Sequence, residues 1–224
     1  MTRKERSEAY LQAHGVTINP NLPELAPDVK VKPAEEILRR AVTAMLASQI
    51  AVDLASGNNV QESAAFFTGL LRRFGLEKEL TPVERKLFAL ANPTYHAELS
   101  PQDGAQLSWR IEMCMPLFWA CGLLKGELPY PDRLSAIEGL VRIIGAAESF
   151  DVLLILTQMR SDDEILDLAD LIYRMDWACV DALVRRTEIT GNLNYDVVVE
   201  QHKGCNWMIE AFDAENWDDV KPHT

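Results

Sequence analysis

The chain has 224 residues, of which 48% are hydrophobic and 25% are charged, and its formal net charge is −12. This composition supports a folded core without disulfides and excludes a disordered tail, a collagen, a disulfide-stapled miniprotein and a basic nucleic-acid-binding protein. The most apolar stretch, at 41–54, is interrupted by polar residues, and as a helix it spans about 21 Å against the roughly 30 Å hydrocarbon core of a bilayer. We therefore expect no membrane partner.

The negative charge is concentrated in the second half of the chain. Residues 1–112 contain 13 Lys and Arg against 14 Asp and Glu, a net of −1, whereas residues 113–224 contain 9 against 20, a net of −11. An acidic surface repels phosphate backbones, so we expect no nucleic-acid partner. The leading hypothesis is a non-enzymatic module that binds a basic protein partner through its acidic C-terminal half. Solubility is the simpler explanation of the same charge.

Apolar residues recur at helical spacing along most of the chain. The segment 19–27 contains three prolines and is predicted to be an extended connector, because a proline disfavours helix in the residue before it. Intervals of three and four residues predict helices at 60–74, 81–90, 100–121, 134–144, 161–186 and 198–212. The apolar run 152–156 fits a buried strand or a helix, and its helical neighbours favour helix.

These patterns predict an all-α fold. We expect a single helical domain over 1–224, of about eight or nine helices, with extended N- and C-terminal arms. All five tryptophans lie at 109–217, which predicts a core assembled at about 100–224 with the helices of about 1–99 packed on it. The four cysteines lie in apolar runs without C-x-x-C spacing, and no apolar leader follows the first residues, so we expect a cytoplasmic protein with reduced thiols.

The predicted helix 161–186 carries a row of ionisable side chains on an otherwise apolar helix. Asp163, Asp167, Asp170, Arg174 and Asp181 fall on one face at helical spacing. Because Asp170 and Arg174 are one turn apart, an internal ion pair that orients the helix explains the row. The alternative is a divalent-cation site, in which Asp163, Asp167 and Asp170 supply the oxygen ligands that Mg²⁺ and Ca²⁺ prefer.

The last predicted helix places His202 on its apolar stripe, with Asn206 one turn further on and Gly204 permitting close approach of another helix. A hydrogen-bonded core histidine is the simpler interpretation. The alternative is an enzyme or a small-ligand-binding protein that uses a polar cleft between the two C-terminal helices. That cleft would be lined by Asp170, Arg174, Asp181, Glu200, His202 and Asn206.

No cofactor is expected from the sequence. It contains no G-x-x-x-x-G-K-[ST] loop, no G-x-G-x-x-G fingerprint, no G-x-S-x-G elbow and no H-E-x-x-H zinc motif. Cys205 is three residues from His202, but its apolar neighbours indicate an inert thiol. Covalent catalysis and a zinc site are therefore not predicted.

Three blocks near the C-terminus combine Trp, Tyr, Asp, Arg and His at fixed spacing. They are ADLIYRMDWACVDA at 169–182, VVVEQHKGCNWMIE at 197–210 and WDDV at 217–220. In these blocks, and in its opening over 6–23, the chain resembles an uncharacterised bacterial family, domain-of-unknown-function family 4272. Gly204 and Cys205 stand where a small residue and a leucine are expected. The resemblance implies a cytosolic, mainly helical protein, and it implies no activity.

Overall fold

The computed structural model describes residues 1–26, 29–95, 99–210 and 216–223. In these ranges every regular element is a helix, which confirms the all-α prediction. The α-helices are α1 (Arg3–Ala13), α2 (Ala34–Ser56), α3 (Val60–Arg73), α4 (Pro82–Ala89), α5 (Pro101–Ser108), α6 (Arg110–Ala120), α7 (Glu138–Ala146), α8 (Phe150–Leu156), α9 (Asp162–Arg185) and α10 (Tyr195–Met208), with short 3₁₀ turns at Glu77–Glu79 and Thr190–Asn192. Only Trp109, which has helical backbone angles, separates α5 from α6, so the described ranges hold nine helices when these two are counted as one.

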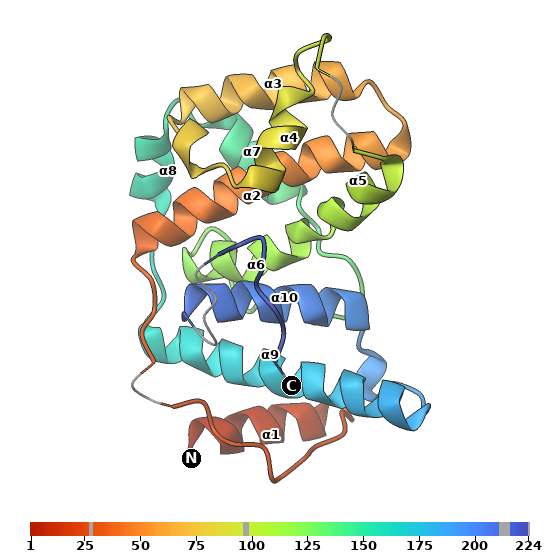
Figure 1. Ribbon diagram of the computed structural model, residues 1–224. Coiled ribbons are helices and arrows are strands. Elements are labelled where there is room, and N and C mark those ends of the chain that lie inside the picture. The colour runs from red at the N-terminus through yellow and green to blue at the C-terminus, as the bar shows by residue number, and fades with distance from the viewer. Residues whose placement is uncertain (27–28, 96–98, 211–215, 224) are drawn as a thin grey trace.

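The helices are stacked in layers (Figure 1). Helix α1 packs on α9, α9 on α10, α10 on α6, α6 on α2 and α2 on α3, so that six helices follow one another from the bottom of the molecule to the top. The remaining helices cover α2, with α5 and α4 in direct contact with it. The two C-terminal helices of the predicted cleft are therefore neighbours in the lower half of the stack.

Helix α2 lies at the centre of the hydrophobic core. It is buried over most of its 23 residues and belongs to one continuous apolar cluster that also contains Trp119, Trp207 and Trp217. The first half of the chain thus supplies the central helix of a core that holds tryptophans of the second half. No helix within the described ranges has the length and apolarity needed to cross a membrane.

Local signals in the sequence set most helix boundaries. Thr81 and Ser100 form capping boxes at the starts of α4 and α5, and the apolar run 152–156 lies in the helix α8, as its neighbours predicted. The prediction that a helix starts at 134 is wrong, because α7 begins at Glu138. The backbone N–H of Ser135 instead donates to the buried carboxylate of Glu112, at 2.7 Å, which holds this segment outside the helix. The predicted helix end at 212 lies outside the described residues.

The N-terminal arm consists of α1 and a connector, residues 14–33, which runs back along α9 before α2 begins (Figure 1). The described residues of the connector contain no helix, which agrees with the extended segment predicted at 19–27. At its start His14 stacks between Tyr10 and Tyr130, with ring centroids 4.1 and 5.0 Å away. The arm is therefore anchored to the body of the protein before it passes α9.

The block WDDV attaches the C-terminal arm to α2, α6 and α10. The Trp217 ring meets Trp207 edge to face with centroids 5.4 Å apart, and the Arg40 guanidinium lies 5.2 Å from its centre. The neighbouring carboxylate of Asp218 accepts a hydrogen bond from Arg110 at 2.6 Å. This arm returns the chain to the face of α10 that carries the polar residues of the predicted cleft.

Candidate ligand cavity between α9 and α10

The first two aspartates of the predicted row lie against α1. The Asp167 carboxylate accepts hydrogen bonds from Arg3, at 2.9 Å, and from both the Nε and an Nη of Arg6, at 2.9 and 2.6 Å. Arg3 also reaches Asp163 at 3.4 Å. Cations from the first half of the chain therefore neutralise acids of the second half across the α1–α9 contact.

These pairs bear directly on the metal hypothesis. Burial alone would raise the pKa of Asp167, but hydrogen bonds from Arg6 and Arg3 outweigh burial and hold that pKa below its ordinary value. The carboxylate is thus ionised and already engaged. Within the part of the chain that the structure describes, no three His, Cys, Asp or Glu side chains are placed to hold a metal ion. Asp163, Asp167 and Asp170 do not gather into such a group.

Asp170 and Arg174 form a buried ion pair, with exposed side-chain fractions of 0% and 2%. Arg174 donates through Nε at 2.8 Å and through Nη2 at 3.0 Å, so both carboxylate oxygens are used. The same pair holds the connector, because Arg174 also donates to the carbonyl of Pro23 at 2.8 Å and Asp170 accepts the N–H of Leu25 at 3.2 Å. The pair therefore fixes both α9 and the chain segment that crosses it.

Two of the predicted cleft residues lie elsewhere. Asp181 pairs with Arg185, one turn along α9 at 2.8 Å, and Glu200 pairs with Lys203 on α10. Glu200 and Lys203 face a different hollow, between α6, α10 and the C-terminal arm. Of the six residues predicted to share one cleft, Asp181 and Glu200 thus lie elsewhere, and Arg174 is not among the residues that line the cavity described below.

His202 is buried and bonded to a residue that the sequence analysis missed. Its Nδ1 lies 2.7 Å from Oδ2 of Asp176, and both side chains are at most 2% exposed. Asp176 falls on the apolar face of α9, away from the predicted row. That position could have indicated the contact from the sequence, because a carboxylate on a buried apolar face requires a hydrogen-bonding partner. The imidazole of His202, on the apolar stripe of the last helix, is a side chain that can supply one.

A cavity of about 590 Å³ lies between α9, the C-terminal end of α10 and the connector. Three of the six predicted residues line it: Asp170, His202 and Asn206. Asn206 is held by a hydrogen bond from its amide to the carbonyl of Lys221, at 3.1 Å, in the C-terminal arm. The other described lining residues are Pro23, Glu24, Leu25, Ala26, Val29, Lys30, Ala169, Tyr173, Ile209 and Glu210. We call this space the α9–α10 cavity.

The lining determines what chemistry the cavity can support. Because Asp176 engages Nδ1 of His202, Nε2 is the ring nitrogen that can meet an occupant as a hydrogen-bond or proton acceptor. Tyr173, whose ring centre lies 5.9 Å from that of His202, has its pKa raised by burial, so its hydroxyl keeps its proton. The described lining contains no serine, threonine or cysteine. The arrangement can therefore bind a ligand or transfer a proton, but it offers no hydroxyl or thiol of the usual nucleophilic kind.

The cysteines do not extend this chemistry. All four are free and buried. Burial raises the pKa of Cys205 to about 12, so the thiol stays protonated and is a poor nucleophile. The sequence-based interpretation of Cys205 as inert is consistent with this environment.

The family model for a domain of unknown function, DUF4272, matches residues 3–220, which is nearly the whole chain. The chain belongs to the DUF4272 family. No curated protein and no solved structure matches it.

The blocks that carry the resemblance to DUF4272 are also the segments that build the cavity. The block at 169–182 supplies the Asp170–Arg174 pair and Asp176, and the block at 197–210 supplies His202 and Asn206. WDDV anchors the arm whose backbone holds Asn206. In this DUF4272 protein the first two blocks therefore line the α9–α10 cavity, and WDDV fixes the arm whose Lys221 carbonyl holds Asn206.

Proposed function

We propose that the protein binds a small, mainly apolar molecule in the α9–α10 cavity. Ligand sites are typically concave spaces of about 300–1,000 Å³ with apolar walls and a few converging polar groups. The cavity has such a volume, and its polar groups include His202, Tyr173 and Asn206. The observation that carries the proposal is that His202, oriented by the buried Asp176, lines this cavity.

A purely structural role explains the His202–Asp176 pair less well. The second carboxylate oxygen of Asp176, Oδ1, is buried and accepts no hydrogen bond from the described residues. A buried carboxylate oxygen without a hydrogen bond lowers the stability of the fold. A pair whose only role was packing would have this cost without any benefit. In the Asp170–Arg174 pair on the same helix both carboxylate oxygens are bonded, although Nη1 of Arg174 is also buried without a hydrogen-bond partner among the described residues.

The proposal is tested by screening a library of uncharged, cationic and anionic fragments against the full, isotope-labelled chain by nuclear magnetic resonance. Bound fragments are expected to shift the imidazole signals of His202 and the backbone signals of Tyr173 and Asn206. The substitution His202→Gln is expected to weaken the best fragment about tenfold, the effect of losing one hydrogen bond.

A matched control is available in the same chain. His14→Gln makes the same chemical change at an exposed histidine outside the cavity lining, and if the backbone signals of the connector show that the arm keeps its position, it should leave fragment affinity unchanged. Fragments that shift His14 and not His202 would contradict the proposal. The same holds if a diverse library yields no fragment that perturbs the cavity of the folded protein.

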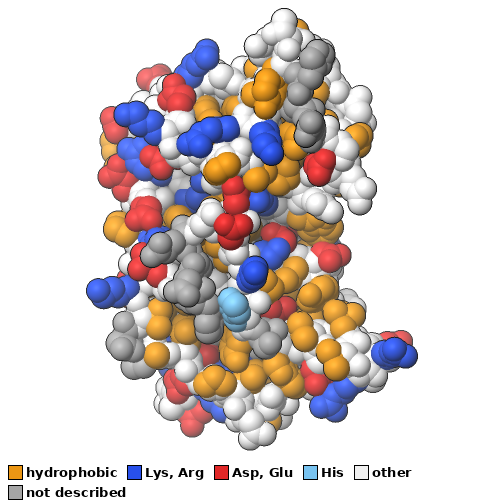
Figure 2. All heavy atoms as spheres, viewed as in Figure 1, with side chains coloured by type: hydrophobic (Ala, Val, Ile, Leu, Met, Phe, Trp, Pro, Cys, Tyr) orange, Lys and Arg blue, Asp and Glu red, His pale blue; other side chains and the backbone are white. Residues whose placement is uncertain are grey.

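A second candidate is the binding of a basic protein, and the observation in its favour is a set of unpaired surface carboxylates. In the second half of the chain, eight exposed acidic residues form no ion pair with a described residue: Glu127, Glu138, Glu148, Asp151, Asp162, Glu188, Asp196 and Asp219. Ten others in that half are paired, several with cations of the first half, so the −11 of the sequence is partly compensated. On the face shown in Figure 2 the acidic side chains are scattered and hydrophobic ones gather over α9 and α10. These features favour the cavity as the primary site.

The second candidate has its own test. If exposed carboxylates bind a basic partner, a stoichiometric basic protein captured by the tagged chain should dissociate as salt rises from about 0.05 to 0.5 M, where the Debye length falls to a few ångströms. The measurement is the retained fraction at each salt concentration. Retention that does not change with salt would contradict an electrostatic interface.

A further inference from the structure

We infer that the occupant of the α9–α10 cavity is an apolar molecule whose polar end is an uncharged hydrogen-bond donor, such as a hydroxyl group, and not an anion. This inference rests on the proposed function and specifies its ligand. It follows from the charges that surround the cavity, from the hydrogen-bonding state of His202 and from the apolar walls.

The acidic side chains of the described lining are engaged by other groups of the protein. Glu24 accepts the backbone N–H of Arg3, at 2.8 Å, at the start of α1. Glu210 pairs with Lys32 at 2.9 Å, and that hydrogen bond holds the pKa of Glu210 below its ordinary value. Asp170 is bonded on both oxygens. Three carboxylates thus face the cavity, with Asp170 buried and Glu24 and Glu210 exposed, and each is already engaged by a donor or cation of the protein.

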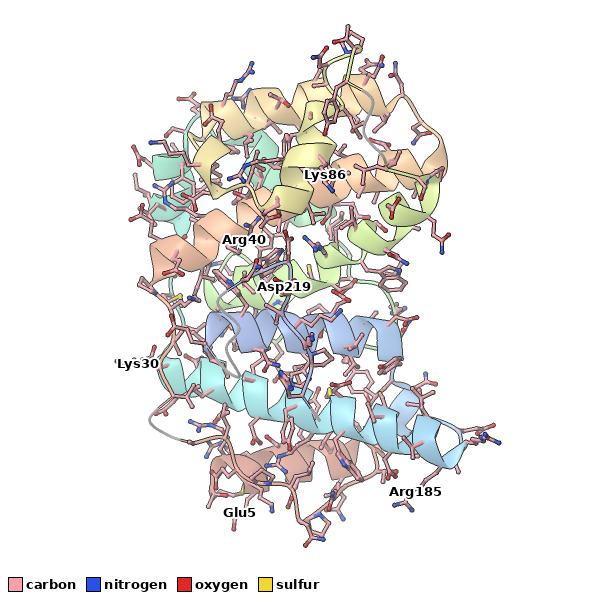
Figure 3. All side chains as sticks on the ribbon, viewed as in Figure 1. Glu5, Lys30, Arg40, Lys86, Arg185 and Asp219 are labelled. Carbon is pink, nitrogen blue, oxygen red and sulfur yellow. The ribbon has the colours of Figure 1, made fainter. Side chains whose placement is uncertain are left out.

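Both buried cations near the cavity are already paired with carboxylates of the protein. Arg174 is committed to Asp170, and Lys32 to Glu210 and Glu36. Lys30 is the only basic side chain among the described lining residues; it is exposed, and in Figure 3 it lies at the edge of the molecule. A carboxylate or phosphate in the cavity would therefore lose its hydration without gaining a buried cation, which is strongly unfavourable.

His202 determines which uncharged groups are preferred. Nδ1 of His202 lies 2.7 Å from Oδ2 of Asp176, so an imidazole that donates its single proton to that oxygen presents a lone pair on Nε2. A ligand hydroxyl or N–H can donate to that lone pair. A ligand ether or carbonyl cannot, and in binding it would leave Nε2 without a partner in a poorly hydrated space.

The remaining walls select an apolar body for this donor. Leu25, Ala26 and Val29 of the connector face Ala169 of α9 and Ile209 at the end of α10 across the cavity. These side chains offer no hydrogen-bonding groups, so a sugar or another polyhydroxylated ligand would lose hydrogen bonds to water without replacement. One donor on a hydrocarbon body matches the lining.

The test compares three ligands that share one hydrocarbon body: 4-phenylbutan-1-ol, its methyl ether and 4-phenylbutanoate. Affinity is measured by calorimetry on the full chain, and binding at the cavity is confirmed by the ¹⁵N signal of His202 Nε2, which also reports whether that nitrogen carries a proton. We expect the alcohol to bind about tenfold more tightly than the ether and more tightly still than the carboxylate.

The double substitution Asp176→Leu and His202→Phe removes the acceptor and its buried partner together, which avoids leaving a lone buried charge. In that variant the alcohol should bind no better than the ether. Equal or tighter binding of the ether or the carboxylate to the unmodified chain would overturn the inference and leave the cavity as a ligand site. A failure of all three to perturb His202, with fragments binding elsewhere, would overturn the proposed function as well.

Discussion

Replacing Gly204 by alanine is expected to destabilise the protein by about 2 kcal/mol or more, although alanine is normally the better helix residue by about 1 kcal/mol. A Cβ at this position would lie 2.1 Å from the carbonyl oxygen of Met113 and 3.1 Å from its carbonyl carbon. Both atoms are backbone of α6, so no side chain can rotate away. Helix α10 would have to move off α6 and carry His202 with it.

Gly69 provides the matched control. It lies inside α3, it is exposed, and a Cβ there would meet no atom within 4 Å. Gly69→Ala should therefore stabilise the protein by about 0.5–1 kcal/mol. Denaturant unfolding followed by circular dichroism measures both variants. If Gly204→Ala shifted the unfolding midpoint in the same direction as Gly69→Ala, the close approach of α6 and α10 would be wrong.

The contrast between these two glycines shows what the sequence could predict about the fold. Helix periodicity and capping boxes depend on residues close in the chain, so α3, α4, α9 and the class of the fold were predictable. The expectation that Gly204 admits another helix is confirmed, because this position lies against the backbone of Met113 in α6. The identity of that helix was not predictable. It depends on how α6 and α10, about 90 residues apart, pack on each other.

The same limit applies to the candidate site. Because Asp170 and Arg174 are one turn apart, their pairing followed from the sequence. Asp176 was missed because its partner, His202, lies 26 residues away on another helix. Asp181 and Glu200 were predicted to line the cleft only because of the helix face on which they fall. In the structure each pairs instead with a cation within one turn of its own helix. Spacing on one helix therefore predicted the Asp170–Arg174 pair but not the Asp181–Arg185 and Glu200–Lys203 pairs, and the contact between His202 and Asp176 required the structure.

Replacing Arg174 by alanine is expected to cost about 3–5 kcal/mol, because Asp170 would remain as a buried carboxylate without its cation. The substitution also removes the hydrogen bond to the Pro23 carbonyl, so the connector loses one of its attachments to α9. Since Pro23 and Leu25 line the α9–α10 cavity, ligand affinity should fall together with stability. If the pair only fixed the position of α9, stability alone would decrease.

Arg185→Ala is the matched control for this prediction, because Asp181 and Arg185 form the same pair, four residues apart on the same helix, at its exposed end (Figure 3). The Arg185 side chain is 68% exposed, so its removal should cost no more than about 0.5 kcal/mol. Replacing both partners of the buried pair, Asp170→Leu with Arg174→Met, should recover most of the stability lost in Arg174→Ala, since no lone charge remains. It should not recover ligand affinity, because the connector would still lack its hydrogen bonds to α9. Equal costs for Arg174→Ala and Arg185→Ala would show that the Asp170–Arg174 pair is not buried, and would remove the physical basis for a fixed cavity wall.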